Sequence, residues 1–232
     1  MMTMYEKLMT LSIFKGVGPE QLSMFLEKTH LDFDNYEAGA VIQPLLEDCN
    51  GLKCVLSGRI EMVYTLSGGE GRLVAEYGPG KVLGLERLFG MDTRTRHEVR
   101  ALEPCGTMSF SKEQYMSLLR NNHICLINYL NYLNYHCQRI EVSMESLYSR
   151  SVAGTLATVV SLMTDRDCRR IVLEGMDRLW ATGPENAQAD YDRQVDELVD
   201  AGYVKFGNEG EIIIESRQTL LDYAESLKEE SR

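Results

Sequence analysis

One stretch, residues 122–148, constrains the fold of this chain more than any other. Apolar side chains recur along it at alternating intervals of four and three residues, at Leu126, Leu130, Leu133, Cys137, Ile140, Met144 and Leu147. This heptad rhythm keeps a narrow apolar seam on one side of a helix, and no Pro or Gly interrupts it. At about 1.5 Å per residue the helix would extend roughly 40 Å, longer than a small domain is wide. We therefore predict a coiled-coil dimerisation helix over residues 122–149; the alternative is a core helix within one chain.

The composition narrows the class of protein. A chain of 232 residues can form one large domain or two ordinary ones, and its 44% apolar and 25% charged residues are typical of soluble proteins. The sequence contains neither a signal-peptide pattern nor a run of about 18 apolar residues, so we expect a cytoplasmic protein that does not enter a membrane. The six cysteines are scattered without a C-x-x-C pair, which predicts reduced and mostly buried thiols.

Residues 1–121 have the pattern of a β domain. After a helical lead-in over residues 5–29, short β-type runs alternate with turns that are rich in glycine. The clearest runs are residues 53–56, 60–66, 72–77, 98–102 and 107–110. Many short strands punctuated by glycine predict an N-terminal antiparallel β jelly roll of the cupin-like kind.

Residues 150–232 carry a mostly helical pattern. The expected elements, in order, are two helices, a turn, a helix, a hairpin and a final helix, over residues 151–164, 176–180, 183–186, 187–201, 203–215 and 218–228. Gly202 follows the third helix, in the position of a C-cap glycine. A helix-turn-helix followed by a hairpin is the outline of a winged helix, so the whole chain is expected to be an α+β protein.

Taken in order, the jelly roll, the long helix and the winged helix resemble the CRP/FNR family of transcription regulators. The resemblance spans nearly the whole chain and is carried by Cys54–Met62, Ser67–Arg72, Gly78–Gly84, Val195–Val204 and Glu211–Ile214. It implies a bacterial homodimer in which a small-molecule effector, bound in an effector-binding domain over residues 1–121, controls how two winged helices bind DNA. It also implies a regulator rather than an enzyme.

The resemblance places an effector site after the Gly80–Gly84 turn. In relatives that bind cyclic nucleotides, a Glu there contacts the ribose and an Arg contacts the phosphate; the matching positions of this chain are Leu85 and Thr95. The effector-binding residues we predict instead are their neighbours Glu86, Arg94 and Arg96. A contact between Arg and phosphate requires a fixed direction, and a shift of one residue on a strand reverses the side chain. We therefore expect an effector other than cyclic AMP.

The same segment allows two interpretations. Arg94 and Arg96 belong, with Arg87 and Arg100, to the most basic stretch of an acidic chain, whose net charge is -11. One interpretation is a pocket for a different anionic small molecule. The other is a solvated loop in which these arginines pair with nearby carboxylates, at Glu86, Asp92 and Glu98.

The resemblance also assigns DNA contacts to the helix over residues 187–201 and to the hairpin after it. The DNA-binding residues that we predict are Gln188, Tyr191, Arg193, Lys205 and Asn208. Gln188 can pair with adenine, and Arg193 with guanine or a phosphate. Six carboxylates surround that single arginine, at Glu185, Asp190, Asp192, Asp196, Glu197 and Asp200. The alternative is therefore a degenerate family member whose acidic winged helix is a protein-interaction module without DNA binding.

Motifs for catalysis and for metal binding are absent from the sequence. It contains no Ser/His/Asp arrangement, no H-E-x-x-H and no P-loop, so we predict no enzymatic activity. The iron–sulfur members of the family need cysteines ahead of the barrel, and residues 1–48 contain none. No two of the four histidines have H-x-x-x-H spacing. We therefore expect no metal site and no cofactor.

Overall fold

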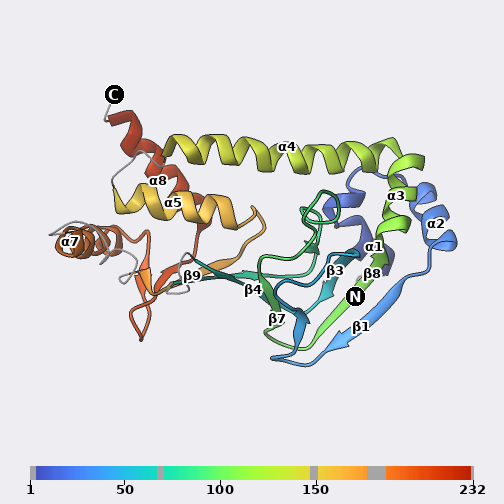
Figure 1. Cartoon of the computed structure of the whole chain (residues 1–232), viewed down its shortest axis with the longest axis horizontal. Helices are drawn as coiled ribbons and strands as arrows, with labels where there is room; N and C mark the ends of the chain where they lie inside the picture. Colours follow the sequence, from blue (N-terminus) through green and yellow to red (C-terminus); the bar gives the residue numbers. More distant parts are fainter. Residues whose placement is uncertain (1–3, 67–70, 147–150, 177–186, 231–232) are drawn as a thin grey trace. The chain divides into compact units, whose positions relative to one another are not determined.

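The computed structural model describes residues 4–66, 71–146, 151–176 and 187–230 (Figure 1). It confirms the predicted α+β class and the antiparallel strands. The chain divides into two units, each of which is built from segments distant in sequence. Unit 1 comprises Met1–Glu61 and Gly78–Tyr135, and unit 2 comprises Met62–Tyr77 and His136–Arg232.

A four-stranded antiparallel sheet forms the centre of unit 1, in the order β1–β8–β3–β6. These strands are Asp32–Tyr36, Cys105–Ser111, Gly51–Ser57 and Val82–Leu83. Two further strands of unit 1 pair antiparallel, β2 (Val41–Gln43) with β7 (Glu98–Ala101). The predicted turn after β3 is present: Gly58 has a φ of +80°, and a Cβ atom there would lie 2.5 Å from the carbonyl oxygen of Pro104. Glycine is therefore required at that turn.

Helices cover one face of this four-stranded sheet. They are α1 (Met4–Met9), the 3-10 helix η1 (Ser12–Phe14), α2 (Pro19–Lys28), α3 (Lys112–Asn121) and the first part of α4 (His123–Ser146). Because side chains alternate along a strand, every second residue of β3 and β8 faces the helices. These inward residues share one core cluster with the helices: Leu52, Cys54, Leu56, Met108 and Phe110.

Two helix caps connect β8 to the long helix without a loop. Ser111 ends β8 and begins α3 with a capping box, in which its hydroxyl accepts from the Gln114 backbone N–H and Gln114 accepts from the Ser111 N–H. Asn122 ends α3, and its side-chain oxygen accepts from the backbone N–H groups of Ile124 and Cys125 at 3.0 and 3.1 Å. The start of α4 is therefore held in a defined direction from the sheet.

The long helix α4 is a single uninterrupted helix (Figure 1). Its predicted seam is unevenly exposed: Leu126 and Leu133 are half-buried against the core cluster of unit 1, whereas Leu130 (43% exposed) and Ile140 (52%) face outward. Cys137 is also exposed, and so is Ile127 (53%). No described part of this chain covers Ile127, Leu130, Cys137 and Ile140, which we call the exposed apolar stripe of α4 below. The side chain of Met144, and Leu147, lie outside the described residues.

Unit 2 contains an antiparallel sheet with three helices. The strands follow the order β10–β11–β9–β5–β4 and are Lys205–Phe206, Ile212–Ile214, Arg170–Glu174, Arg72–Tyr77 and Ile60–Thr65, the last beginning in unit 1. The helices are α5 (Val152–Met163), α7 (Ala187–Asp200) and α8 (Arg217–Glu230). Most of the first helix and the whole turn of the predicted helix-turn-helix, residues 177–186, lie outside the described residues.

The grouping of residues 62–77 differs from the sequence-based division into 1–121, 122–149 and 150–232. Strand β5 of the hairpin pairs with β9 of the C-terminal residues, and β4 is hydrogen-bonded to β7, whereas the sequence pattern attached the whole hairpin to the jelly roll. No helix of the described segments is long and apolar enough to span a bilayer.

Candidate effector site and candidate nucleic-acid interface

The segment after β6 begins with a glycine that no other residue can replace without movement. Gly84 has a φ of +93°, and a Cβ atom there would lie 2.8 Å from Cys49 Sγ and 2.9 Å from the carbonyl oxygen of Gly51. The carbonyl of Gly84 then accepts from the backbone N–H groups of Arg87 and Leu88, which forms a tight turn. The turn directs Leu85 into the core cluster of unit 1 and leaves Glu86 exposed.

Thr95, at the position of the phosphate-binding Arg of the relatives, is buried and already bonded. Its hydroxyl donates to the carbonyl oxygen of Pro44 at 2.9 Å. Its backbone N–H donates to Glu47 O, and its carbonyl accepts from the Leu46 N–H. Leu85 and Thr95 carry neither a carboxylate nor a guanidinium, and the polar groups of Thr95 are already bonded within the chain.

Arg94 and Arg96 flank Thr95 and face outward, and both bind one carboxylate. Arg94 Nε donates to Asp92 Oδ1 at 3.0 Å, and Arg96 Nη2 donates to Asp92 Oδ2. These contacts, that of Arg94 first, lower the pKa of the exposed Asp92 carboxyl to about 2. The arrangement matches the solvated-loop interpretation of this stretch, in which the arginines are neutralised locally.

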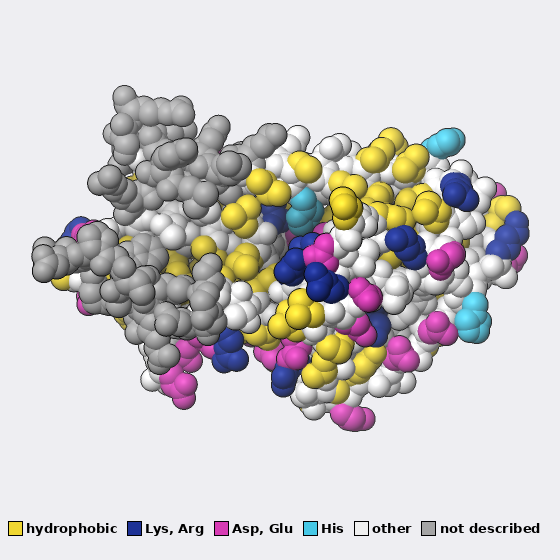
Figure 2. Space-filling model, in the orientation of Figure 1, with side chains coloured by type: hydrophobic (Ala, Val, Ile, Leu, Met, Phe, Trp, Pro, Cys, Tyr) yellow, Lys and Arg dark blue, Asp and Glu magenta, His cyan; other side chains and the backbone are white. Residues whose placement is uncertain are grey.

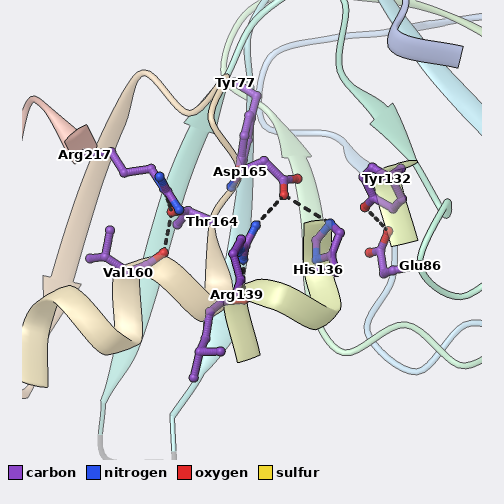
Figure 3. A network of polar contacts seen from close by, with 10 residues as sticks. Tyr77, Glu86, Tyr132, His136, Arg139, Val160, Thr164, Asp165 and Arg217 are labelled. Carbon is purple, nitrogen blue, oxygen red and sulfur yellow. Dashed lines mark hydrogen bonds and ion pairs between the residues drawn. The ribbon is translucent and has the colours of Figure 1, made fainter. Parts of the chain in front are cut away.

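Glu86, the third predicted effector residue, has a different partner. The Tyr132 hydroxyl of α4 donates to Glu86 Oε2 at 3.2 Å (Figure 3). Tyr129, one turn earlier on α4, is buried, and burial together with the charge of Glu86 raises the pKa of its hydroxyl. Glu86 therefore ties the Gly84 segment to the long helix.

Sequence analysis missed a polar cavity of about 300 Å³ on the other face of the four-stranded sheet. Lys53 of β3 lies opposite Ser109 of β8, and both line it. Lys53 Nζ donates to the Tyr36 hydroxyl at 2.7 Å and to the carbonyl oxygen of Ile42 at 3.3 Å. On the same face, the buried hydroxyls of Thr107 and Ser109 have no hydrogen-bond partner among the described residues. Alternate polar residues on a strand usually indicate a solvent-facing side, which is why the pattern did not reveal a pocket.

The predicted DNA-binding residues of α7 occupy two different faces of that helix. Tyr191 is 5% exposed and belongs with Val195 and Leu198 to the buried face, so its ring is a core residue and does not reach the exposed surface. Arg193 is exposed, and its guanidinium donates to Asp190 and Glu197 at 2.6 Å each. The side chain of Gln188 lies outside the described residues.

In the hairpin after α7, the predicted DNA-binding lysine is also paired with a carboxylate. Lys205 of β10 donates to Glu215 at 2.8 Å, and Asn208 is exposed in the turn between β10 and β11. On the coloured part of the face seen in Figure 2, Lys and Arg side chains lie among Asp and Glu side chains. Among the described residues, no group of His, Cys, Asp and Glu side chains could hold a metal ion.

Residues 33–122 match the family model of the cyclic nucleotide-binding domain. This confirms the sequence-based resemblance for the N-terminal domain, whereas the winged helix remains a prediction. Among curated proteins, none has a sequence that matches this chain.

Solved structures resemble the chain at low sequence identity. The Catabolite Activator Protein of Thermus thermophilus is 18% identical, with a TM-score of 0.54 over 93% of this chain and 99% of that one. The sensor domain of the regulator DNR from Pseudomonas aeruginosa is 18% identical, with a TM-score of 0.47 over 56% and 90%. A transcriptional regulator from Thermotoga maritima is also 18% identical, with a TM-score of 0.47 over 55% and 97%. At this identity the likeness to the first of these shows a shared fold.

The pairing at Asp92 predicts an unusually acidic carboxyl. We expect an NMR titration of Asp92 to give a pKa of about 2, and the double variant Arg94→Gln, Arg96→Gln to return it towards 3.8. Because the folded-state pKa is lowered, the contribution of this cluster to stability is present above pH 3.8 and is lost as the pH falls to about 2. An unchanged Asp92 pKa in the double variant would show that the arginines are not the cause.

Proposed function

We propose that this chain is a homodimeric transcription regulator without enzymatic activity. Its N-terminal sensor domain would control DNA binding by a C-terminal winged helix. The observation that carries the proposal is the succession of a cyclic nucleotide-binding domain over residues 33–122 and an uninterrupted helix of 24 residues. The order α5–β9–α7–β10–β11–α8 that follows supports a winged helix, in which α7 would be the recognition helix.

The exposed stripe of α4 supports a homodimer. Leu130, Cys137 and Ile140 keep the spacing of seven and three residues of a coiled-coil seam, and all three are open to a second helix. Two copies of α4 packed side by side would remove this apolar surface from water, which favours association. Leu126 and Leu133 are half-buried against unit 1, and their exposed parts would contact the second helix at the side of the seam.

We predict that Leu130→Asp together with Ile140→Asp converts a dimer into a monomer. Both residues are exposed in the single chain, so the fold should remain, whereas an unpaired charge in a dry interface is strongly unfavourable. Sedimentation equilibrium measures the mass. The control variant is Asn131→Asp with Gln138→Asp, at exposed positions one residue after Leu130 and two residues before Ile140, and it should stay dimeric. A dimer that survives the first pair of substitutions would place the interface elsewhere.

The effector that we propose is a small polar molecule other than a cyclic nucleotide. Leu85 and Thr95 provide no charged group for a ribose phosphate, and Arg94 and Arg96 are already bound to Asp92. The cavity beside Lys53 has the size of a small ligand site. It is lined by the Lys53 ammonium group, the Ser109 hydroxyl and three carboxylates, those of Asp32, Glu47 and Asp48. Binding by Glu86, Arg94 and Arg96 instead would require Tyr132 and Asp92 to give up their contacts.

We predict that neither cyclic AMP nor cyclic GMP binds tightly. Isothermal titration calorimetry should detect no dissociation constant in the micromolar range for either nucleotide, because the two charged contact positions of the relatives are filled by Leu85 and Thr95. A micromolar value that disappears in Arg94→Gln, Arg96→Gln would mean that these arginines leave Asp92 and hold the phosphate.

DNA binding is proposed to depend on the release of Arg193. Its salt bridges to Asp190 and Glu197 cover the only cation on the exposed face of α7, as far as the structure describes that helix. DNA phosphates would compete with these carboxylates, so affinity should be weak at physiological salt and should fall further as salt increases. This predicts a regulator with low non-specific binding.

We predict opposite effects from two variants of α7. Arg193→Ala should lower affinity for a selected operator at least about tenfold, as expected for loss of a base or phosphate contact. Asp190→Asn with Glu197→Gln should raise affinity for all sequences and steepen its salt dependence by about one unit of slope. Fluorescence anisotropy with DNA fragments selected from genomic DNA measures both, and Glu225→Gln on the exposed side of α8 controls for the change in charge. If no fragment is retained even at low salt, the DNA-binding proposal fails and an interaction module takes its place.

A further inference from the structure

The polar side chains of the cavity beside Lys53 form a row across the four-stranded sheet. Asp32 of β1 lies opposite Ser109 of β8, and Ser109 lies opposite Lys53 of β3. Side chains directly opposite in adjacent strands point to the same face of a sheet, so these three belong together. The row runs from a carboxylate through a hydroxyl to an ammonium group, and all three residues line the cavity.

Lys53 brings a positive charge to the cavity that its described contacts do not neutralise. Its Nζ donates to the Tyr36 hydroxyl and to the carbonyl oxygen of Ile42, which are both neutral acceptors. A lysine ammonium group has three N–H donors, so these two contacts leave the third for another acceptor. Arg94 and Arg193 differ in this respect, because their guanidinium groups are paired with carboxylates. The Lys53 ammonium group is therefore suited to bind an anionic group from outside the chain.

Two buried hydroxyls of β8 lie on the same face and have no hydrogen-bond partner among the described residues. They belong to Ser109 and to Thr107, which is only 1% exposed. A buried hydroxyl that makes no hydrogen bond destabilises the folded chain, so an apolar side chain in its place would favour folding. Because Ser109 lines the cavity, a molecule bound there can supply the missing partner.

Among the charged residues of the lining, the exposed ones are acidic and the half-buried one is basic. Asp32, Glu47 and Asp48 are exposed, whereas Lys53 is half-buried. His30 Nε2 lies 3.3 Å from Asp32 Oδ1 and adds a positive charge only when the imidazole is protonated. The excess of carboxylates favours a ligand that also carries a cation. Since no such side chains of the described segments could hold a metal ion, that cation is best supplied by an organic ammonium group.

The loop between β2 and β3 holds Glu47 and Asp48 in a fixed position. The Leu46 N–H donates to the carbonyl oxygen of Thr95 at 3.1 Å, and the Thr95 N–H donates to the carbonyl oxygen of Glu47 at 2.9 Å. Leu46 has a φ of +63°, and no other non-glycine residue in the described part of the chain has a positive φ. Such a conformation persists only where the surrounding structure enforces it. The backbone beside the cavity is therefore arranged before a ligand binds.

We infer that this cavity binds a small zwitterion of the amino-acid class. Its carboxylate would contact Lys53 and Ser109, and its ammonium group would contact the exposed carboxylates. A ligand with only an anionic group, such as a cyclic nucleotide, would be repelled by the acidic residues, and one with only an amine would be repelled by Lys53. The volume of about 300 Å³ lies at the lower end of the range for small-molecule sites, which suits a ligand of this size. The inference rests on the proposed function only in treating the cavity as the effector site.

Calorimetry of the full-length chain without DNA tests the inference. The probes are the standard amino acids, β-alanine and γ-aminobutyrate, together with analogues of each that lack either the ammonium group or the carboxylate. At least one zwitterion should bind with a dissociation constant below about 1 mM, and its two single-charge analogues should bind at least about tenfold more weakly. If no zwitterion binds, or if a single-charge analogue binds equally well, the inference is overturned.

Variants on the two charged sides of the cavity identify the groups that hold the ligand. Lys53→Met keeps the length of the side chain but removes the ammonium group, and it should lower affinity for the bound zwitterion at least about tenfold. Glu47→Gln with Asp48→Asn should have a similar effect through the ligand's ammonium group. Lys15→Met and Glu27→Gln, at exposed positions of the same unit, are the matched controls and should leave affinity unchanged. A Lys53→Met chain that binds as well as the native one would contradict the inference.

Ser109→Ala separates ligand binding from folding. The substitution removes a hydroxyl that has no described partner, so the ligand-free chain should unfold at the same or a higher temperature. Affinity for the bound zwitterion should nevertheless fall about fivefold, as expected for the loss of one hydrogen bond. A lower unfolding temperature with unchanged affinity would show that the hydroxyl has a structural role and would count against the inference.

The fate of this inference can be distinguished from that of the proposed function. A zwitterion that binds in the calorimeter but leaves affinity for DNA unchanged would keep the ligand class and refute its role as an effector. Failure of dimerisation or of DNA binding would contradict the proposed function and leave the calorimetric result intact. If DNA is bound while every zwitterion fails to bind, the regulator proposal stands and the ligand class is wrong.

Discussion

The register between β3 and β8 is the constraint on which the first unit depends. It directs Leu52, Cys54 and Phe110 towards the helices, and Lys53 and Ser109 towards the opposite face. A slip of one residue would exchange these faces and place an ammonium group in the apolar core. β8 runs into α3 through the Ser111 cap, and β6, which pairs with β3, leads into the Gly84 turn. The positions of the long helix and of the candidate effector segment therefore depend on the same sheet.

Neutralisation of an arginine by a nearby carboxylate recurs at several sites of this protein. Asp92 pairs with Arg94 and Arg96, and Arg193 pairs with both Asp190 and Glu197. Asp165 pairs with the buried Arg139. With 35 acidic and 24 basic residues, carboxylates are in excess, so few guanidinium groups are open to an outside anion. At these arginines, a ligand that carries negative charge must compete with a carboxylate that is already in place, which favours selective over tight binding.

Much of the fold could be predicted because its signals are local. The predicted run 72–77 coincides with β5, the run 60–66 with β4, and the heptad stretch with α4. Strand β9 was missed because its partner β5 is about 100 residues away, and a short run such as Arg170–Glu174 has no local sign of pairing. At the candidate effector site, the burial of Leu85 and Thr95 was not predicted. Tyr191 was assigned to DNA although its spacing of four and seven residues from Val195 and Leu198 already indicated a buried face.

The sharing of the C-terminal sheet by the hairpin has a consequence for how copies of this chain can associate. A fragment that begins near residue 150 would expose the edge of β9, with unpaired backbone groups and a partly uncovered apolar face. Such edges recruit strands from other molecules, by aggregation or by exchange of identical segments. The hairpin thus covers the edge of β9 within the same chain. Any truncated or grafted C-terminal region of this protein should therefore include the hairpin.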